Sequence, residues 1–432
     1  MNQNGDNWKN VVRVSARTNV GLRRANNQDS HTIALASSRQ QFRKHGHLFV
    51  VADGMGAHAA GELASKIAVD AISLSYSKRN SESVSEALQN SVYDAHKQIR
   101  TQSEQDEAFH DMGTTIDALV ISPQGAVIAH VGDSRVYRLR DRVYEQLTFD
   151  HSLVWEIRAS GKIPRDKIPA YIPKNVITRS LGPSENLKVD LEGPFSIRSG
   201  DYFLMCSDGL SGKVEDVEMG QILSILPPEY ATELLINLAN LRGGPDNITV
   251  VLAQVNASLE DSPETPGILR PEKAISGRTF SLLALICLIF ALLGLALSGY
   301  SLFTDLHSSW ANIAAAIITL FFGGGFFLLA GREISNERMA DDNHSHQFGR
   351  APYVRVNATP TPDFAGELAT MVQQLRDAAK GEQWVIHWDE IDHHEQFAEA
   401  AVQAEDFSKA IYHYSLAINC MMRELKKQNK RK

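Results

Sequence analysis

Four aspartates of this chain stand at the ends of strand-like runs, close to glycines. Asp53 follows "VVA", Asp133 follows "AHVG", Asp208 follows "FLMCS", and Asp246 precedes "NITVVL". A buried carboxylate is costly unless something pairs with it, and one such residue alone would be explained as the polar cap of a turn. Four together are better explained by a site of hard oxygen ligands, which suits Mg²⁺ or Mn²⁺. The sequence shows no cluster of histidines and cysteines that would make a softer site.

The stretch "TNVGLRRANNQDS" adds an arginine and a fifth carboxylate upstream of these four. Arg24 can hold a phosphate by bidentate hydrogen bonds when a pair of hard cations lies nearby. Asp29 ends the same Asn- and Gln-rich turn, and Gly54, after Asp53, lets the backbone approach whatever binds there. Taken alone, the stretch would be an ordinary surface turn. Together with the four aspartates it indicates phosphoryl chemistry assisted by metal ions.

The elements that must position these side chains lie in one block, near residues 10–255. Strand-like runs cover 47–52, 114–121, 126–131, 135–140, 202–206 and 248–255, and helix-like runs cover 60–79, 82–103, 150–161 and 230–242. Two long helical runs follow one another without a strand between them, which breaks a strict alternation of strands and helices. The order therefore predicts a layered α+β domain rather than a doubly wound parallel sheet.

The composition limits the classes of protein that this chain can belong to. At 432 residues it is long enough for more than one domain, and 43% hydrophobic with 22% charged residues describe a folding chain. A net charge of −8 argues against nucleic acid as a partner. Cys206, Cys287 and Cys420 lie too far apart for a disulfide framework or a zinc ribbon, and they fit a reducing compartment. The polar N-terminus lacks the apolar core of a signal peptide.

Two uncharged runs late in the chain predict a membrane hairpin over residues 279–331. The runs cover 279–304 and 308–331, and each exceeds the ~20 residues that cross a bilayer. Buried helices of a soluble core are the alternative, but they would have to be long and almost wholly apolar. Basic residues lie only on the outer flanks of the pair, at Arg270, Lys273, Arg278, Arg332 and Arg338. By the positive-inside rule we expect both termini on the cytoplasmic side of the inner membrane.

Two linkers, 256–278 and 332–363, separate the hairpin from the block before it and from a helical tail at 364–432. In the tail, "FAEAAVQAEDFSKAIYHYSLAI" has the small and aromatic positions of one tetratricopeptide-like repeat. An ordinary amphipathic helix pair explains the pattern equally well, because one repeat cannot bury its own core. We expect the tail to bind a protein partner. Its basic end could contact anionic lipid, but we favour a solvated helix end.

Eight segments of the first block, in order, resemble the bacterial branch of the metal-dependent type 2C (PPM-type) serine/threonine protein phosphatases. They are "VGLRRANNQDS", "VVADGMGAHAAGE", "DMGTTIDALVI", "AHVGDSRVYRLRD", "LTFDHSLV", "NVITRSLG", "YFLMCSDGLSG" and "GGPDNITVVL". The resemblance covers residues 11–255 and is far more specific than one motif. It implies a four-layer α-β-β-α domain with two antiparallel sheets. With the other predictions, the expected fold is this α+β domain, then two transmembrane helices and a small α-helical tail.

The resemblance also implies a role for the acidic residues. It implies two Mn²⁺ or Mg²⁺ ions, with a third, weaker ion at Asp133. The implied ligands of the first two ions are Asp53, the carbonyl of Gly54, Asp208 and Asp246. A hydroxide that bridges two such ions attacks phosphorus directly, so the reaction needs no protein nucleophile.

Other residues are implied to act beside the ions. Arg24 would hold the substrate phosphate, and Asp29 would hold metal-bound water. Residues 150–182 would form a flap beside the site. Asp117 stands where relatives tend to carry threonine or a small residue, and it could face the surface or add a charge near the core. His58 could protonate the leaving alkoxide or be a loop histidine.

The predicted function is that of a membrane-anchored serine/threonine protein phosphatase. Its substrates would be phosphoserine and phosphothreonine proteins, those of a cognate Ser/Thr kinase. One alternative is a catalytically silent, phosphatase-like membrane scaffold or sensor, and another is a hydrolase of a different phosphoester. Loss of Asp53 or Asp246 would have favoured the silent form, and both are present.

Overall fold

The structure is a computed structural model. The chain forms two compact units. The described residues are 11–57, 59–160, 172–173, 176–256, 348–382 and 384–429. One unit combines residues 1–262 with 346–432, and the other is 263–345. The hairpin predicted at 279–331 lies outside the described residues, as does nearly all of the linker 256–278. In the part of the chain that is described, no helix is long and apolar enough to cross a bilayer.

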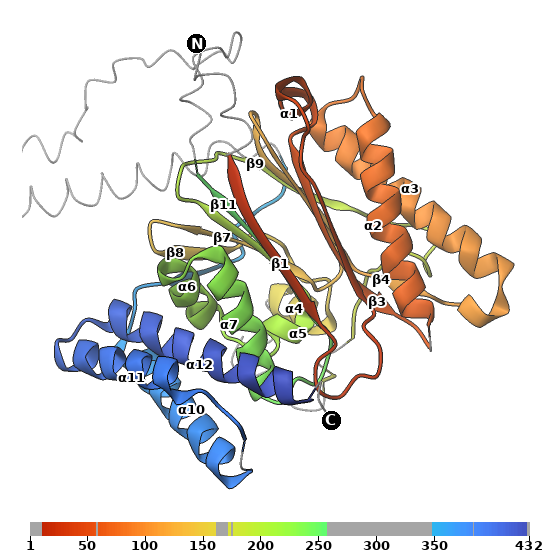
Figure 1. Ribbon diagram of the computed structural model, residues 1–432. Coiled ribbons are helices and arrows are strands. Elements are labelled where there is room, and N and C mark those ends of the chain that lie inside the picture. The colour runs from red at the N-terminus through yellow and green to blue at the C-terminus, as the bar shows by residue number, and fades with distance from the viewer. Residues whose placement is uncertain are drawn as a thin grey trace, which may run out of the picture. The chain divides into compact units, whose positions relative to one another are not determined.

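Two six-stranded antiparallel sheets form the centre of the first unit (Figure 1). One has the order β1 (Val12–Asn19), β11 (Ile248–Val255), β10 (Tyr202–Cys206), β7 (Arg135–Arg140), β8 (Val143–Gln146) and β12 (Val354–Asn357). The other has the order β2 (Asp29–Ala34), β3 (His47–Met55), β5 (Ile116–Ser122), β6 (Gly125–Val131) and β9 (Asp190–Phe195), with β4 (Gly113–Thr114) beside β3. The two antiparallel sheets that the sequence predicted are confirmed.

Helices cover the outer faces of the two sheets. The described helices of residues 11–256 are α1 (Arg39–His45), α2 (Ala60–Lys78), α3 (Val84–Gln105), α4 (Leu153–Ala159), α5 (Asp208–Ser211), α6 (Asp216–Ile225) and α7 (Pro228–Leu241), with a 3₁₀ turn at Glu107–Phe109. In Figure 1, α2 and α3 lie on the side of β3, and α6 and α7 lie on the side of β1 and β11. These helices and the two sheets make the four layers that the sequence predicted.

The central strands are buried on both faces, which explains why their sequences are continuous apolar runs. In β3, Phe49 and Val51 belong to the hydrophobic cluster between the sheets, whereas Leu48 and Val50 belong to the cluster under α2 and α3. Side chains alternate along a strand with a period of two. Asp53, two residues after Val51, therefore points to the space between the sheets, at their end.

The sequence analysis did not predict five of the strands, β1, β2, β8, β9 and β12. β1 shows why, because it is the edge strand of its sheet. Only Val12 and Ser15 of this strand are buried, while Arg13 and Arg17 are exposed. The helix expected at 150–161 is shorter than predicted, because His151 takes part in buried polar contacts instead.

The prediction of a linker over 332–363 is wrong for its last third. β12 pairs antiparallel with β8, so the chain returns to extend the sheet that begins with β1. Glu192 of β9 fixes the residues just before β12. Its carboxylate accepts hydrogen bonds from the backbone N–H of Arg350 and Ala351 and from Tyr353 Oη (2.5 Å). A linker was expected because this stretch is rich in proline and polar residues, and the strand exists only because the edge of β8 pairs with it.

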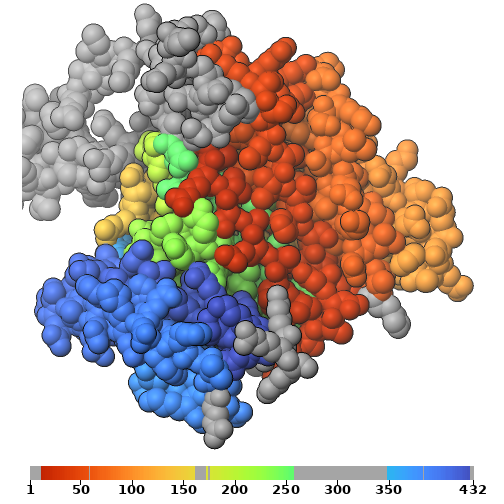
Figure 2. All heavy atoms as spheres, in the orientation of Figure 1, coloured from red at the N-terminus to blue at the C-terminus, as the bar shows by residue number. Residues whose placement is uncertain are grey.

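The tail has three helices, α10 (Pro362–Gly381), α11 (Trp388–Gln403) and α12 (Phe407–Asn429), and α12 contacts the α+β domain at α6 and α7. Arg423 of α12 binds both carboxylate oxygens of Glu233 at 2.7 and 2.5 Å, and Asn419 Oδ1 accepts a hydrogen bond from Asn237 Nδ2. One hydrophobic cluster includes side chains of α7 and of all three tail helices. Figure 2 shows the blue tail against the green part of the domain. The helix pair thus gains the apolar partner that a single repeat lacks.

Gly220 in α6 offers a test of how the returning segment packs. An added Cβ at Gly220 would lie 2.9 Å from the Cβ atoms of both Ala358 and Tyr144. We expect G220A to lower the free energy of unfolding by about 1–3 kcal/mol through overpacking. G366A, in an open position of α10, is the matched control and should raise it by up to ~1 kcal/mol. Thermal unfolding of the full chain measures both, and a G220A midpoint at or above that of wild type would contradict this packing.

Candidate metal centre

The first pair of site carboxylates comes from adjacent strands of one sheet. Asp29 at the start of β2 stands directly opposite Asp53 near the end of β3, so both side chains lie on the same face. Gly54 lets this end of the sheet close, because an added Cβ would lie 2.0 Å from Gly61 O and 2.6 Å from Gln28 O. There is thus no room for a side chain at Gly54, and the approach of its carbonyl to a bound ion stays a prediction.

The second pair comes from the other sheet. Asp208 begins α5 directly after β10, and Asp246 precedes β11, the neighbour of β10. The two turns touch, since an added Cβ at Gly209 would lie 1.9 Å from Asn247 O. Asp133 lies in the turn between β6 and β7, where the chain passes from one sheet to the other. The structure therefore brings all five aspartates to the same end of the two sheets.

Electrostatic repulsion shows how close these carboxylates are. Burial raises the pKa of Asp53 well above its ordinary value, and the negative charges of the other four aspartates raise it further. Burial also raises the pKa of Asp29 and of Asp133 to about 7 each, although Ser207 Oγ donates a hydrogen bond to Asp29 Oδ2 at 2.7 Å. The pKa of Asp208 is raised by burial and by Asp246. The cluster is thus destabilised unless positive charge compensates it.

Two oxygens of the cluster show that divalent cations fit it. Asp29 Oδ1 and Asp208 Oδ1 are buried and have no hydrogen-bond partner among the described residues. Buried carboxylate oxygens without partners are rare in folded proteins, and each requires an explanation. Because all the side-chain donors are oxygens, the site suits Mg²⁺ or Mn²⁺ rather than a soft metal.

Arg24 stands at the opening of the cluster. Its Nη2 lies 2.8 Å from Asp246 Oδ2, and its side chain is 48% exposed. The guanidinium is also close enough to interact with the charges of Asp53 and Asp208. The structure therefore places Arg24 with the predicted metal ligands and leaves part of it accessible to a ligand from solvent.

The sequence analysis missed the residues that hold the aspartates in place. Thr115 Oγ1 accepts a hydrogen bond from Asp53 N (3.0 Å) and pairs with Ser134 Oγ (2.7 Å), while Thr114 Oγ1 donates to Asp53 O. Asn247 ties the upstream turn to β11, because its Oδ1 accepts from Gln28 N. These hydroxyls and amides lie inside the motifs "GTT", "GDS" and "DNI", but the motifs alone do not show which backbone groups they bind.

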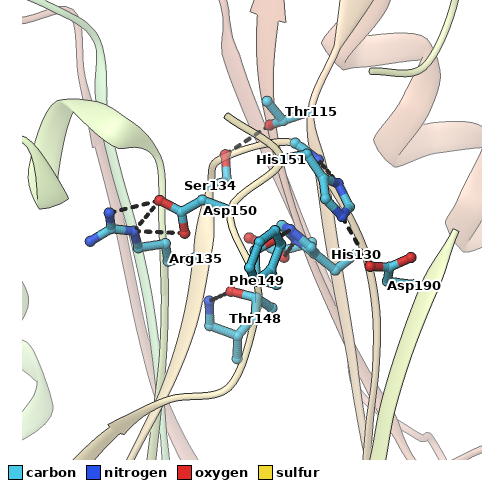
Figure 3. A network of polar contacts seen from close by, with 12 residues as sticks. Thr115, His130, Ser134, Arg135, Thr148, Phe149, Asp150, His151 and Asp190 are labelled. Atoms are coloured by element: carbon cyan, nitrogen blue, oxygen red, sulfur yellow. Dashed lines mark hydrogen bonds and ion pairs between the residues drawn. The ribbon is translucent and has the colours of Figure 1, made fainter. Parts of the chain in front are cut away.

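A buried polar network supports the turn that carries Asp133 (Figure 3). Asp117 is fully buried and pairs with His130 Nδ1 at 2.7 Å, and His130 Nε2 donates to the Phe149 carbonyl. Burial lowers the pKa of His130, but the charge and hydrogen bond of Asp117, the charge of Asp150 and the Phe149 carbonyl together raise it by more, so the net shift is upward. Of the two roles that the sequence left open for Asp117, the structure supports the charge near the core.

His151 clamps the same turn from the other side. Its Nδ1 accepts from Gly132 N (3.0 Å), and its backbone N–H donates to Gly132 O (2.7 Å). Burial lowers the pKa of His151 to about 4, so the ring is neutral and its one proton lies on Nε2, facing Asp190 Oδ2 at 3.0 Å. The network thus reaches the start of the predicted flap. Residues 161–171 and 174–175 of that flap, and His58, lie outside the described residues.

Two stacked antiparallel sheets with a carboxylate cluster and an arginine at one end define a metal-dependent phosphoester hydrolase. Comparisons with known proteins agree with this class. The sequence profile of protein phosphatase 2C matches residues 23–228. Protein phosphatase PhpP of Streptococcus pneumoniae is 37% identical over 250 residues, which are 57% of this chain and 98% of that protein. Serine/threonine phosphatase stp of Listeria monocytogenes is 36% identical over 244 residues, 55% of this chain and 94% of that protein.

Solved structures give the same result. The serine/threonine phosphatase PstP/Ppp of Mycobacterium tuberculosis is 34% identical with a TM-score of 0.51, and the match covers 57% of this chain and 99% of that one. The S. agalactiae serine/threonine phosphatase is 33% identical with a TM-score of 0.51, covering 57% and 100%. This chain therefore belongs to the protein phosphatase 2C family, and its enzyme class is serine/threonine protein phosphatase.

Asp133 allows a test of the repulsion within the cluster. An unfolded aspartate has a pKa near 3.8, whereas folding raises the pKa of Asp133 to about 7. Between these values the folded state holds a proton that the unfolded state has lost, so this group reduces stability increasingly as the pH rises through that window. In EDTA, we expect D133N to be more stable than wild type at pH 8, by about 2 kcal/mol, and nearly equal at pH 4.

The measurement is chemical unfolding of the metal-free protein at the two pH values. D70N, which changes an exposed aspartate of α2, is the control for the charge change itself. If D133N and D70N shifted stability equally at pH 8, the repulsion at Asp133 would be refuted.

Proposed function

We propose that this chain hydrolyses phosphoserine and phosphothreonine in proteins, with two Mn²⁺ or Mg²⁺ ions held by the carboxylate cluster. The observation that carries the proposal is the pair of buried oxygens without partners, Asp29 Oδ1 and Asp208 Oδ1, inside a cluster whose charges repel one another. The names of the relatives, all phosphatases, support the same activity.

The proposed metal ligands are Asp53, the carbonyl of Gly54, Asp208 and Asp246, with Asp133 available to a third ion. When bound, the ions supply Lewis acidity, which activates water and neutralises charge on the phosphoryl oxygens. Bound cations would also offset the mutual repulsion that, with burial, raises the pKa values of these carboxyls.

The remaining site residues bind and orient. Asp29 is held by Ser207, and its Oδ1 is left to accept a hydrogen bond from the attacking water. Arg24 is paired with Asp246 at 2.8 Å. If Asp246 held a cation, the Arg24 guanidinium would be available to bind two oxygens of the substrate phosphate. Its exposure at the opening of the site fits a phosphorylated side chain on a protein surface.

Phosphate release from a phosphothreonine peptide tests the activity. The full chain should be active with Mn²⁺ or Mg²⁺ and inactive in EDTA, and D208A should lower kcat by at least about 100-fold, because it removes one proposed ligand. D70A, in an exposed part of α2, is the matched control and should keep wild-type activity. A folded, metal-loaded wild type without turnover would instead support the silent scaffold.

We also propose that residues 279–331 anchor the enzyme to the cytoplasmic membrane by two spans. The two uncharged runs support this proposal. The compact unit adds a second argument, because residues on both sides of the segment, up to 256 and from 348, belong to it. A segment whose two ends join one folded unit must cross the membrane an even number of times. The substrates are then phosphoproteins of a membrane-associated Ser/Thr kinase, and the binding of a protein by the tail stays a prediction.

Cell fractionation tests the anchor. Wild type should sediment with membranes and resist alkaline extraction, whereas a variant with 279–331 replaced by a Gly/Ser linker should stay in the supernatant and keep its phosphatase activity. D208A is the control, because losing a catalytic residue should leave the protein in the membrane fraction. Wild-type protein in the supernatant would refute the anchor without affecting the proposed activity.

A further inference from the structure

A second group of metal-binding side chains lies in the tail, between α11 and α12. Glu390 and His394 are one turn apart on α11, and Cys420 of α12 packs against them. One potential ligand atom from each of the three lies within 4.8 Å of the other two. The sequence analysis found no cluster of histidines and cysteines, because Cys420 reaches the other two residues only after the two helices pack.

The donor set differs from that of the catalytic cluster. It contains a thiol, an imidazole and a carboxylate, whereas the catalytic ligands are all oxygens. Nitrogen and sulfur donors favour Zn²⁺, which commonly takes three protein ligands and keeps a fourth position for water. Glu390 is exposed and Cys420 is 9% exposed, so an ion can enter from the solvent side of the helix pair.

On coordination, the Cys420 thiol would release its proton to solvent and bind the cation as a thiolate.

A second histidine orients the first. His413 Nδ1 lies 3.1 Å from His394 Nδ1, and the His413 ring stacks on Phe397 with the ring centres 5.2 Å apart. Metal-binding histidines are commonly held in this way by a neighbouring polar group, which sets the ring orientation.

We propose that Glu390, His394 and Cys420 form a Zn²⁺ site that links α11 to α12. The site lies outside residues 23–228, which the family profile matches, and it does not depend on the proposed catalytic reaction. Because α12 also carries the contacts of Arg423 and Asn419 with α7, zinc would stiffen the element that joins the tail to the phosphatase domain.

Cobalt substitution tests the proposal on the full chain in detergent. The protein is stripped with chelator and titrated with Co²⁺, which gives a thiolate-to-cobalt charge-transfer band only when sulfur is a ligand. We expect the band in wild type, in D208N, where a catalytic ligand is altered, and in C206S, where another buried cysteine is altered. C420S should lack the band, and Zn²⁺ should displace Co²⁺ and abolish the band in wild type.

Two further variants guard against a folding defect in C420S. E390Q changes an exposed side chain, and H394N keeps a polar group of similar size, so both should fold. Each should weaken Co²⁺ binding at the sulfur site by about 10-fold or more. Phosphatase activity with Mn²⁺ should be unchanged in E390Q and C420S. Absence of the band in wild type, its persistence in C420S, or wild-type Co²⁺ affinity in both E390Q and H394N would overturn the proposal.

Discussion

Mutual repulsion among the buried carboxylates is the constraint on which the rest of this structure depends. Five aspartates from both sheets meet at one end of the domain, and burial and shared charge raise the pKa values of Asp29, Asp53, Asp133 and Asp208. A flexible scaffold would relax by moving them apart. This scaffold cannot, because Thr115 binds the backbone N–H of Asp53 and Thr114 binds its carbonyl. The strand that carries Asp53 is also buried on both faces. The rigidity of the sheets therefore keeps a site prepared for cations.

The polar network below the site extends this rigidity to the turn of Asp133. Asp117 and His130 form a buried ion pair, and His151 clamps both backbone groups of Gly132. Buried polar groups of this kind are stabilising only when their partners are in place. The turn and the start of the predicted flap are thus connected by hydrogen bonds rather than by apolar packing alone. A change in either is therefore transmitted to the position of Asp133.

The tail gives the phosphatase domain an additional layer outside residues 23–228, the range that the family profile matches. After residue 347 the chain adds β12 to the edge of β8. Helix α12 forms an ion pair and a hydrogen bond with α7. An open sheet edge invites unwanted pairing, and a strand of the same chain satisfies it. The catalytic domain and the tail consequently share one hydrophobic cluster, so they fold as one unit despite the long segment between them.

Much of the site was predictable from the sequence because its signals are local. The glycines beside Asp53 and Asp208 and the order of the motifs identified the family, and the apolar runs located β3, β5 and β11. Edge strands such as β1 were missed, because an exposed strand carries a weak pattern. The supporting roles of Thr115 and Asn247 were missed as well, because a polar side chain in a motif does not show which backbone group it will bind.

By itself, the sequence determined the class of the enzyme, its candidate ligands and the presence of helices in the tail, since each depends on residue types at short spacing. Only the tertiary structure decided that β12 joins the sheet, that Asp117 meets His130, and that Cys420 meets Glu390 and His394. These contacts join residues on different elements. Periodicity shows which face of a strand or helix is apolar, but not which other face will cover it. Which faces cover one another is decided only when the whole core packs.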